Sequence, residues 1–236
     1  WSEDWVFQTT YFCNVHREDD KVTRWIRKNY TPESFGTVYE LAIVAARIFN
    51  RPETLDEISV QLHHRDWSSL AAKLTLMQMH KEQIWSGAYL ISTCGAKMSK
   101  IEYCVELLQE ANEVLPMYDI LTCTEAHWML MQINGIGSFL AAQIVADLKN
   151  TGGHPLRAAL DWQSFSAPGP GSLRGLSWFH ERKITSSTYD DAIEDVKHQI
   201  SWKGDMQNLQ NCMCEYDKYC RVLTGTGRSK RGYDAK

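Results

Sequence analysis

The chain has 236 residues and a mass of 27.2 kDa, and its hydrophobic content of 44% is enough to build a folded core. No run approaches the roughly eighteen apolar residues of a membrane span. The first residues of the sequence show no basic stretch followed by the apolar core of a signal peptide. We therefore expect a globular, cytoplasmic protein without membrane association, located in the host cytoplasm if a phage encodes it. The net charge of −4 excludes a surface covered with nucleic-acid-binding charge, although local basic patches remain possible.

The seven cysteines are odd in number, and a chain of this length does not need a disulfide framework, so we expect them to be reduced. Cys212, Cys214 and Cys220 cluster, but structural zinc usually needs four ligands. The sequence therefore predicts no metal site and no cofactor.

Apolar residues recur at helical spacing along most of the chain, and strict alternation is nearly absent, which predicts an all-α fold. Prolines at positions 32 and 52 mark first helical turns, and Asp66 and Ser99 are candidate N-caps. The predicted helical segments are 35–49, 70–79, 101–115, 126–132 and 139–148, followed by a polar pair of surface helices within 190–210.

Near the N-terminus, residues 12–26 place charges of both signs between aromatic side chains. If this segment is helical, Arg17, Asp20 and Arg24 share one face. With Asn14, these residues are candidates for substrate binding. A surface ion-pair network would explain the same pattern without any function.

Residues 133–144, INGIGSFLAAQI, follow one apolar helix and open another, which is the pattern of a helix-hairpin-helix element at about 124–150. The two glycines allow a close backbone approach, and the N–H groups at the start of the second helix can bind a DNA phosphate. An ordinary helix–helix turn is the alternative. The candidate DNA-binding residues here are Gly135, Ile136, Gly137 and Ser138.

Asp161 follows the second helix of this hairpin, in the place where helix-hairpin-helix glycosylases carry a catalytic aspartate. The preceding Ala158, Ala159 and Leu160 are apolar enough to shelter the carboxylate. Asp161 could instead cap the following turn. The lysine nucleophile of strand-cutting glycosylases has no counterpart in this segment.

Glycines and prolines crowd residues 150–176, which predicts a long loop that is either ordered or functional, with a catalytic part at about 158–176. Within GPGSLRG, the residues Gly169, Gly171 and Ser172 could wrap an anion that Arg174 clamps. A structural turn with an exposed arginine is the alternative. The segment is no nucleotide-binding P-loop, because GxxxxGK[ST] occurs nowhere in the chain.

Toward the C-terminus, residues at three- and four-residue intervals predict one helix face that includes Glu215 and Lys218. A basic tail follows at about 222–236 and could bind DNA through Arg228, Lys230 and Arg231, or could be a solvated, disordered end.

Four stretches together, FCNVHREDDKVTRWI, the GIG hairpin, DWQSFSAPGPGSLRGL and QNCMCEYDKYCR, resemble the phage and bacterial thymine-hypermodification family. Its members are α-glutamyl- or putrescinyl-thymine pyrophosphorylases, also called amino acid:DNA transferases. They are similar to the helical domain of hydroxymethyluracil DNA kinases and to helix-hairpin-helix DNA glycosylases. The resemblance runs from about residue 11 to residue 233. It implies one glycosylase-like unit over residues 1–236, with two helical lobes and a Gly/Pro-rich active-site loop.

The resemblance implies an enzyme that transfers an amine onto the pyrophosphorylated 5-hydroxymethyl group of uracil in double-stranded DNA, releasing pyrophosphate. The amine would come from a free amino acid or a polyamine. Asp161 would accept a proton or stabilise positive charge, and Arg174 would neutralise the departing pyrophosphate. Glu215 and Lys218 would line the pocket with Arg17, Asp20 and Arg24.

Two other functions remain open. The chain could be a helical DNA-binding module that presents its substrate to a hydroxymethyluracil DNA kinase, or it could be a glycosylase that excises a modified base. A structural helical protein without nucleic-acid binding is the third alternative.

Overall fold

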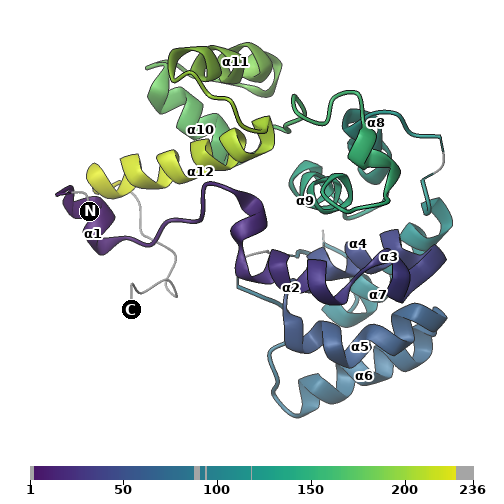
Figure 1. The fold of residues 1–236 in the computed structure, drawn as a ribbon. Coiled ribbons are helices and arrows are strands. Elements are labelled where there is room, and N and C mark those ends of the chain that lie inside the picture. The colour runs from purple at the N-terminus through teal and green to yellow at the C-terminus, as the bar shows by residue number, and fades with distance from the viewer. Residues whose placement is uncertain (1–2, 88–90, 94, 118, 227–236) are drawn as a thin grey trace. The chain divides into compact units, whose positions relative to one another are not determined.

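The computed structural model describes residues 3–87, 91–93, 95–117 and 119–226. Throughout these residues the secondary structure is helical and no strand occurs, so the predicted all-α class is confirmed (Figure 1). The chain divides into two compact units. We call residues 21–162 the central unit, and residues 1–20 together with 163–236 the terminal unit.

The central unit is built around a helix that is buried on every side. This helix is α4 (Tyr39–Phe49), whose residues are all buried and which packs against α5, α7 and α9. A helix that is mostly apolar on every face belongs in a core rather than at a surface, and its buried charged residues, Glu40 and Arg47, have polar partners. The other helices of the unit are α2 (Lys21–Asn29), α3 (Pro32–Phe35), α5 (Pro52–His64), α6 (Trp67–Met79), α7 (Lys100–Val114), α8 (Cys123–Leu130) and α9 (Ser138–Lys149), with the 3₁₀ turn η3 (Pro155–Ala158).

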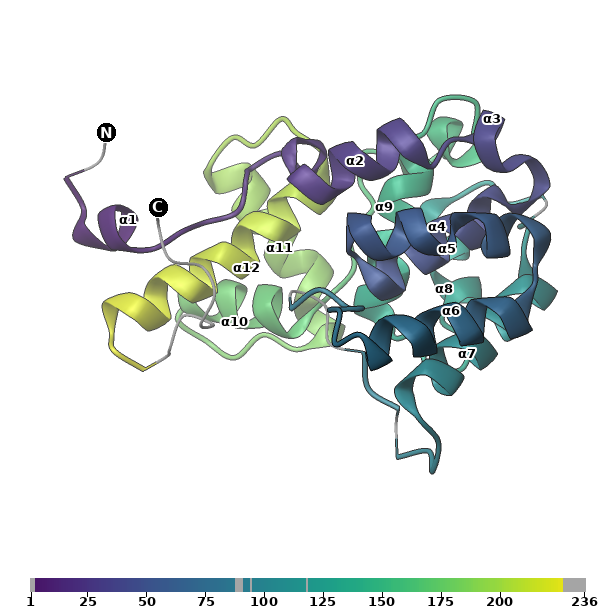
Figure 2. The same ribbon diagram turned by 90° about the horizontal axis from the view of Figure 1, so that it is seen from below.

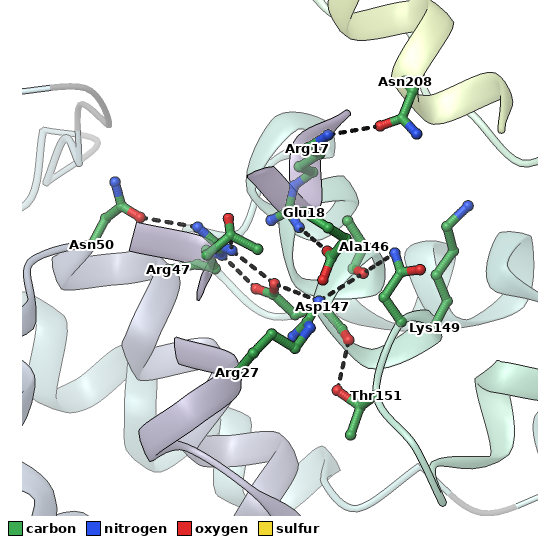
Figure 3. A network of polar contacts seen from close by, with 12 residues as sticks. Arg17, Glu18, Arg27, Arg47, Asn50, Ala146, Asp147, Lys149, Thr151 and Asn208 are labelled. Atoms are coloured by element: carbon green, nitrogen blue, oxygen red, sulfur yellow. Dashed lines mark hydrogen bonds and ion pairs between the residues drawn. The ribbon is translucent and has the colours of Figure 1, made fainter. Parts of the chain in front are cut away.

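One ion pair is buried between α4 and α9. The Arg47 guanidinium donates to both carboxylate oxygens of Asp147, and Arg27 from α2 lies 3.2 Å from the same carboxylate (Figure 3). Arg47 also donates to the Asn50 side-chain oxygen at 3.1 Å. Both members of the pair are almost fully buried, so each charge needs the other to offset the loss of its hydration. This pairing fixes α9, and therefore the second helix of the hairpin, to the core of the unit.

The terminal unit is formed by the two ends of the described chain. It contains α1 (Trp5–Thr9), the 3₁₀ turn η1 (Arg17–Asp19), α10 (Pro170–Phe179), α11 (Tyr189–Gln199) and α12 (Met206–Leu223). Helices α10, α11 and α12 share one apolar core, which includes Leu176, Tyr189, Ile193 and Leu209. Helix α1 packs against α12 (Figure 1).

Most predicted helices are confirmed, including their starts: Asp66 and Ser99 accept hydrogen bonds as N-caps of α6 and α7, and prolines open α3 and α5. The single helix predicted over 35–49 is wrong in its first turn. Gly36 has a φ of +52° and separates α3 from α4. The predicted helix face of Arg17, Asp20 and Arg24 is also wrong, because extended backbone at Asp20 separates η1 from α2.

The glycine–proline segment is less of a loop than its composition predicts, because the chain is helical again from Pro170. Its glycines have a packing role: a Cβ at Gly175 would overlap the Met213 carbonyl of α12, and one at Gly171 would lie 3.1 Å from the Cys214 sulfur. Small residues spaced by four place two bare helix surfaces in contact. The motif therefore brings α10 against α12. The pair of surface helices predicted within 190–210 is only partly present: α11 lies there, but α12 begins at Met206 and continues to Leu223, and both helices bury side chains in this core.

Candidate functional site

A pocket of about 400 Å³ lies in the terminal unit, between the segment that follows α1 and one face of α12. Figure 2 shows this segment running beside α12. A volume of this size is in the range of pockets that hold small-molecule ligands. The pocket is lined by Phe7, Phe12, Cys13, Asn14 and Val15 from the N-terminal side and by Asn211, Cys212, Glu215, Tyr216 and Tyr219 from α12.

Aromatic rings make the pocket mainly apolar. The ring centroids of Phe7 and Phe12 are 5.1 Å apart, and Phe7 lies 5.3 Å from Tyr219. Tyr216 and Tyr219 are stacked at 6.3 Å with an interplanar angle of 9°. Such rings offer flat apolar surfaces on which a planar ligand can stack.

Hydrogen bonds fix the N-terminal segment on α12. The Cys13 backbone N–H donates to Glu215 Oε2 at 3.1 Å, and the Asn211 side chain donates to the Asn14 carbonyl at 3.3 Å. The Lys218 ammonium donates to the Tyr11 carbonyl. These contacts join residues about two hundred positions apart in sequence, so the pocket depends on tertiary structure throughout.

Glu215 supplies a carboxylate at this apolar pocket, with Lys218 Nζ at 3.6 Å. The Lys218 ammonium also lies 5.0 Å from the Phe12 ring centroid, as a cation over an aromatic face. Desolvation raises the pKa of the Cys13 thiol to about 11, and the Glu215 charge adds to the effect. Cys13 is therefore a neutral thiol at physiological pH, while Glu215 and Lys218 form a charge pair beside the rings.

A further hydrogen bond joins the pocket residue Tyr219 to the start of α1. The Tyr219 hydroxyl donates to Asp4 Oδ2 at 2.6 Å, and Asp4 also caps α1 through the Val6 N–H. The hydrogen bond from Tyr219, followed by that of Val6, lowers the pKa of Asp4. The same bond to Asp4 raises the pKa of Tyr219. The Tyr219 ring is thus held in place by its hydroxyl.

The structure brings together some of the residues predicted for substrate binding with two predicted as catalytic, Glu215 and Lys218. Asn14 and Glu215 line the pocket, and Lys218 lies beside it. The Arg17 backbone N–H donates to Asn208 at the start of α12, which anchors η1 to the same unit. Arg24 lies on α2 and belongs to the central unit, whereas Asn14, Arg17, Glu215 and Lys218 belong to the terminal unit.

The predicted hairpin has the expected secondary structure: α8, a turn over residues 131–137, and α9. Gly135 has a φ of +92°, and a Cβ there would overlap the Tyr103 hydroxyl of α7. Both the backbone conformation and the lack of space therefore favour glycine at this position. Gly137 is the N-cap of α9, and a Cβ there would meet no atom within 4 Å. His127 Nε2 lies 3.0 Å from the Ser138 carbonyl. The turn therefore has the open approach that a phosphate contact requires, and phosphate binding by Gly135, Ile136, Gly137 and Ser138 stays a prediction.

Asp161 is bound to the first helix of this hairpin. Its carboxylate accepts hydrogen bonds from the Cys123 and Thr124 backbone N–H groups, at 2.6 and 3.0 Å, and from the Thr124 hydroxyl at 2.7 Å. Partial burial raises the pKa of Asp161, but these hydrogen bonds outweigh it and leave the pKa below its ordinary value. Asp161 is therefore an ionised cap of α8, whose first residues lie 37 and 38 positions earlier in the chain. Leu160 does not shelter the carboxylate as expected, since its side chain is exposed.

Arg174 is paired within the terminal unit. Its guanidinium donates to Asp217 Oδ2, with Nε at 3.0 Å and a terminal nitrogen at 2.9 Å. The buried Ser172 hydroxyl donates to the Gly169 carbonyl and accepts from the Gly169 N–H, so these two residues form the N-terminal cap of α10. The anion-binding role of Gly169, Gly171, Ser172 and Arg174 stays a prediction, and each of these residues has a structural partner or packing role.

Sequence patterns missed the aromatic lining of the pocket: Phe7, Phe12, Tyr216 and Tyr219. The only sequence signal for this lining is the aromatic content of the two segments, FQTTYF and EYDKY. Nothing in either segment indicates that the two meet in the fold. The predicted basic residues Arg228, Lys230 and Arg231 lie outside the described residues. In the described part of the chain, no three metal-ligating side chains converge, and no helix is long and apolar enough to cross a membrane.

Comparison with known proteins gives one match. The model of a family described as "5-hmdU DNA kinase, helical domain" matches residues 1–229. No curated protein and no solved structure matches the chain significantly. The two-lobed glycosylase-like architecture therefore stays a prediction, whereas the thymine-hypermodification context of the resemblance is confirmed.

Proposed function

Because the chain belongs to the family of 5-hmdU DNA kinase helical domains, we propose that it recognises DNA containing 5-hydroxymethyl-2′-deoxyuridine and holds the modified base for a kinase. The chain contains no GxxxxGK[ST] motif for ATP. Phosphoryl transfer would then be the task of a kinase domain, on the same polypeptide or on another one, and this helical chain would supply substrate recognition.

The aromatic pocket of the terminal unit carries this proposal. A pyrimidine that is extruded from the duplex needs apolar faces to replace its lost stacking neighbours, together with a few polar groups that read its edge. Phe7, Phe12 and Tyr219 provide the faces. Glu215 provides an acceptor that the N3–H or the hydroxymethyl group of the base can use.

The hairpin of the central unit would bind the phosphate backbone. Contacts from main-chain N–H groups carry no sequence information, which suits a protein that must act on one modified base in many sequence contexts. Sequence-independent positioning and base-specific recognition would thus come from different units of the chain.

An amine transferase is the second candidate, because four sequence motifs of the chain resemble those of the thymine-hypermodification transferases. It would need Arg174 to leave Asp217 in order to bind pyrophosphate, and Asp161 to act while it caps α8. The observed partners favour the recognition module. Incubation of the chain with pyrophosphorylated hydroxymethyluracil DNA and a pool of amines, followed by mass spectrometry of the nucleosides, separates the two functions: an aminated thymidine would establish the transferase.

Competition binding tests the recognition proposal. Two duplexes that differ only in one 5-hydroxymethyluracil or thymine compete for the protein at low salt, where phosphate contacts contribute most. We expect preference for the modified duplex and loss of this preference in Phe12→Ala. The matched control is Phe179→Ala, which changes a ring packed against the terminal unit's core rather than the pocket. Equal affinity of the wild-type protein for both duplexes would overturn the proposal.

A further inference from the structure

The central unit contains another pocket, of about 350 Å³, which the proposed function does not use. The end of α2 and the following α3 form one side of it, and α5 forms the other. A pocket of this volume can hold a small molecule. All of its lining belongs to the central unit, so one unit alone forms it. The lining residues are Asn29, Tyr30, Ser34 and Phe35 from the first side and Asp56, Ser59, Val60, His63 and His64 from α5.

One face of α5 forms a wall of this pocket. Ser59, Val60 and His63 follow Asp56 after three, four and seven residues, and this spacing places the four side chains on the same side of the helix. Helix α5 therefore offers a carboxylate, a hydroxyl and an imidazole to one pocket.

Aromatic rings form the other wall. The ring centroids of Tyr30 and Phe35 are 4.5 Å apart, and the Phe35 centroid lies 6.3 Å from that of His63. Tyr30 is fixed to α5, because its hydroxyl donates to the Leu55 carbonyl at 2.9 Å. Aromatic faces attract both apolar groups and organic cations. This wall can therefore bind the carbon chain of a ligand as well as a positive charge beside it.

The Asp56 carboxylate has no cationic partner among the residues that the structure describes, in contrast to its neighbour Glu57, which pairs with Lys73. The charge of Asp56 acts on the aromatic wall instead. Burial raises the pKa of the Tyr30 hydroxyl, and the Asp56 charge is the second cause of this rise. A negative charge without a counter-charge therefore lies close to the rings.

The other polar groups of the lining also suit a positively charged ligand. No lysine or arginine lines the pocket, and the neighbouring Lys28 and Glu33 do not line it either. A neutral imidazole, a hydroxyl and an amide each offer an acceptor atom. Asn29 is the last residue of α2 and His64 the last residue of α5, so the negative dipole ends of two helices border the pocket.

We propose that this pocket binds the primary ammonium group of a small organic cation. The ammonium would donate to the Asp56 carboxylate and to the acceptors of α5, while the carbon chain would pack against Tyr30 and Phe35. Binding is non-covalent, so no bond forms or breaks. This ligand site is separate from the proposed recognition of modified DNA, because the other unit of the chain forms it.

Isothermal titration calorimetry with n-butylammonium chloride tests this site, at low ionic strength and at pH 8, where imidazole is ordinarily uncharged. We expect the wild-type protein to bind n-butylammonium and to bind the uncharged 1-butanol about tenfold more weakly or less. In Asp56→Asn the affinity for n-butylammonium should fall about tenfold, because a hydrogen bond to a charged acceptor is lost. The matched control is Glu57→Gln, which neutralises an exposed acid of the same helix outside the lining and should leave the affinity unchanged.

The proposal is overturned if the wild-type protein does not bind n-butylammonium, or if it binds 1-butanol equally well. Equal losses in Asp56→Asn and Glu57→Gln would also overturn it, because the acidic surface would then attract the cation without this pocket. Glu215→Gln separates this pocket from the aromatic pocket of the terminal unit. Loss of binding in Glu215→Gln, with binding retained in Asp56→Asn, would assign the cation to the terminal unit and overturn the proposal.

Discussion

Glu215 and Asp217 lie two residues apart on α12 and have different surroundings. Glu215 faces the aromatic pocket, and its side chain is 21% exposed. Asp217 is 1% exposed and accepts hydrogen bonds from Arg174 and Trp178, with Arg221 also at 3.2 Å. One turn of helix thus places one carboxylate at the pocket and uses the other to hold α10 against α12.

For Glu215, we predict a recognition defect without a folding defect. Glu215→Gln keeps an acceptor for the Cys13 N–H but removes the charge that would face the proposed base. The preference for hydroxymethyluracil over thymine DNA should fall about tenfold, the effect of losing one charge-assisted hydrogen bond. Competition binding measures it, with Glu194→Gln on α11 as the control, because Glu194 also pairs with a lysine in the same unit. Equal loss in both variants would contradict a specific role for Glu215.

For Arg174, we predict a stability defect. Arg174→Ala leaves the buried Asp217 with one cationic partner fewer and should lower the free energy of unfolding by about 1 kcal/mol, a value limited by the solvent exposure of the guanidinium. Thermal unfolding at pH 7 measures this change. An unchanged melting temperature combined with weaker DNA binding would instead support the anion-clamp role.

At the scale of helices, two short contacts position the candidate sites. Asp161 caps α8, and therefore links the chain after η3 to the first helix of the hairpin. Gly171 and Gly175 let α10 lie directly on α12, whose other face forms the pocket. For each contact we predict how a substitution changes the stability of the protein.

Asp161→Asn should change how stability depends on pH. The pKa of Asp161 in the folded protein lies below its ordinary value of 3.8, so its contribution is present above pH 3.8 and is lost as the pH falls through the folded value. We expect a deficit of about 1 kcal/mol in the variant at pH 7, the usual cost of a weakened cap. Denaturant unfolding from pH 7 to pH 3 measures the gap between the two proteins. A gap that stays constant down to pH 3 would show that the carboxylate charge is not responsible.

Gly175→Ala should destabilise the terminal unit although alanine favours helix. The gain in helix propensity is about 1 kcal/mol, whereas overlap of the new Cβ with the Met213 carbonyl forces the helices apart at a cost of about 1–3 kcal/mol or more. Hydrogen exchange should accelerate in α10 and α12. Gly152→Ala is the control, because a Cβ there meets no atom within 4 Å. Equal stability of the Gly175→Ala protein and the wild type would contradict the packing role of the motif.

At the scale of the whole chain, local sequence patterns predict the helices but not their partners. Periodicity and capping residues give the all-α class and the starts of α6 and α7, since these depend on neighbours within a few residues. The terminal unit joins the first twenty residues to the last third of the chain, and the pocket needs both parts. No local pattern contains that pairing, so the aromatic lining could not be predicted.

Distant partners also explain why sequence patterns did not predict the structural roles of two charged residues, Asp161 and Arg174. Asp161 and Arg174 are chemically suited to catalysis, and the sequence shows their identity without their partners. The N–H groups that bind Asp161 lie 37 and 38 positions away, and the carboxylate that binds Arg174 lies 43 positions away. Glu215 lies at a pocket, and its role there stays a prediction.

We propose that the modified base enters the aromatic pocket of the terminal unit. Photocrosslinking tests it most directly: a duplex with 5-iodouracil at the target position is bound and irradiated, and the crosslinked peptides are identified by mass spectrometry. We expect crosslinks to Phe7, Phe12, Tyr216 or Tyr219, and an excess of hydroxymethyluracil duplex should suppress them more strongly than an excess of thymine duplex. Crosslinks confined to peptides of the central unit would contradict it.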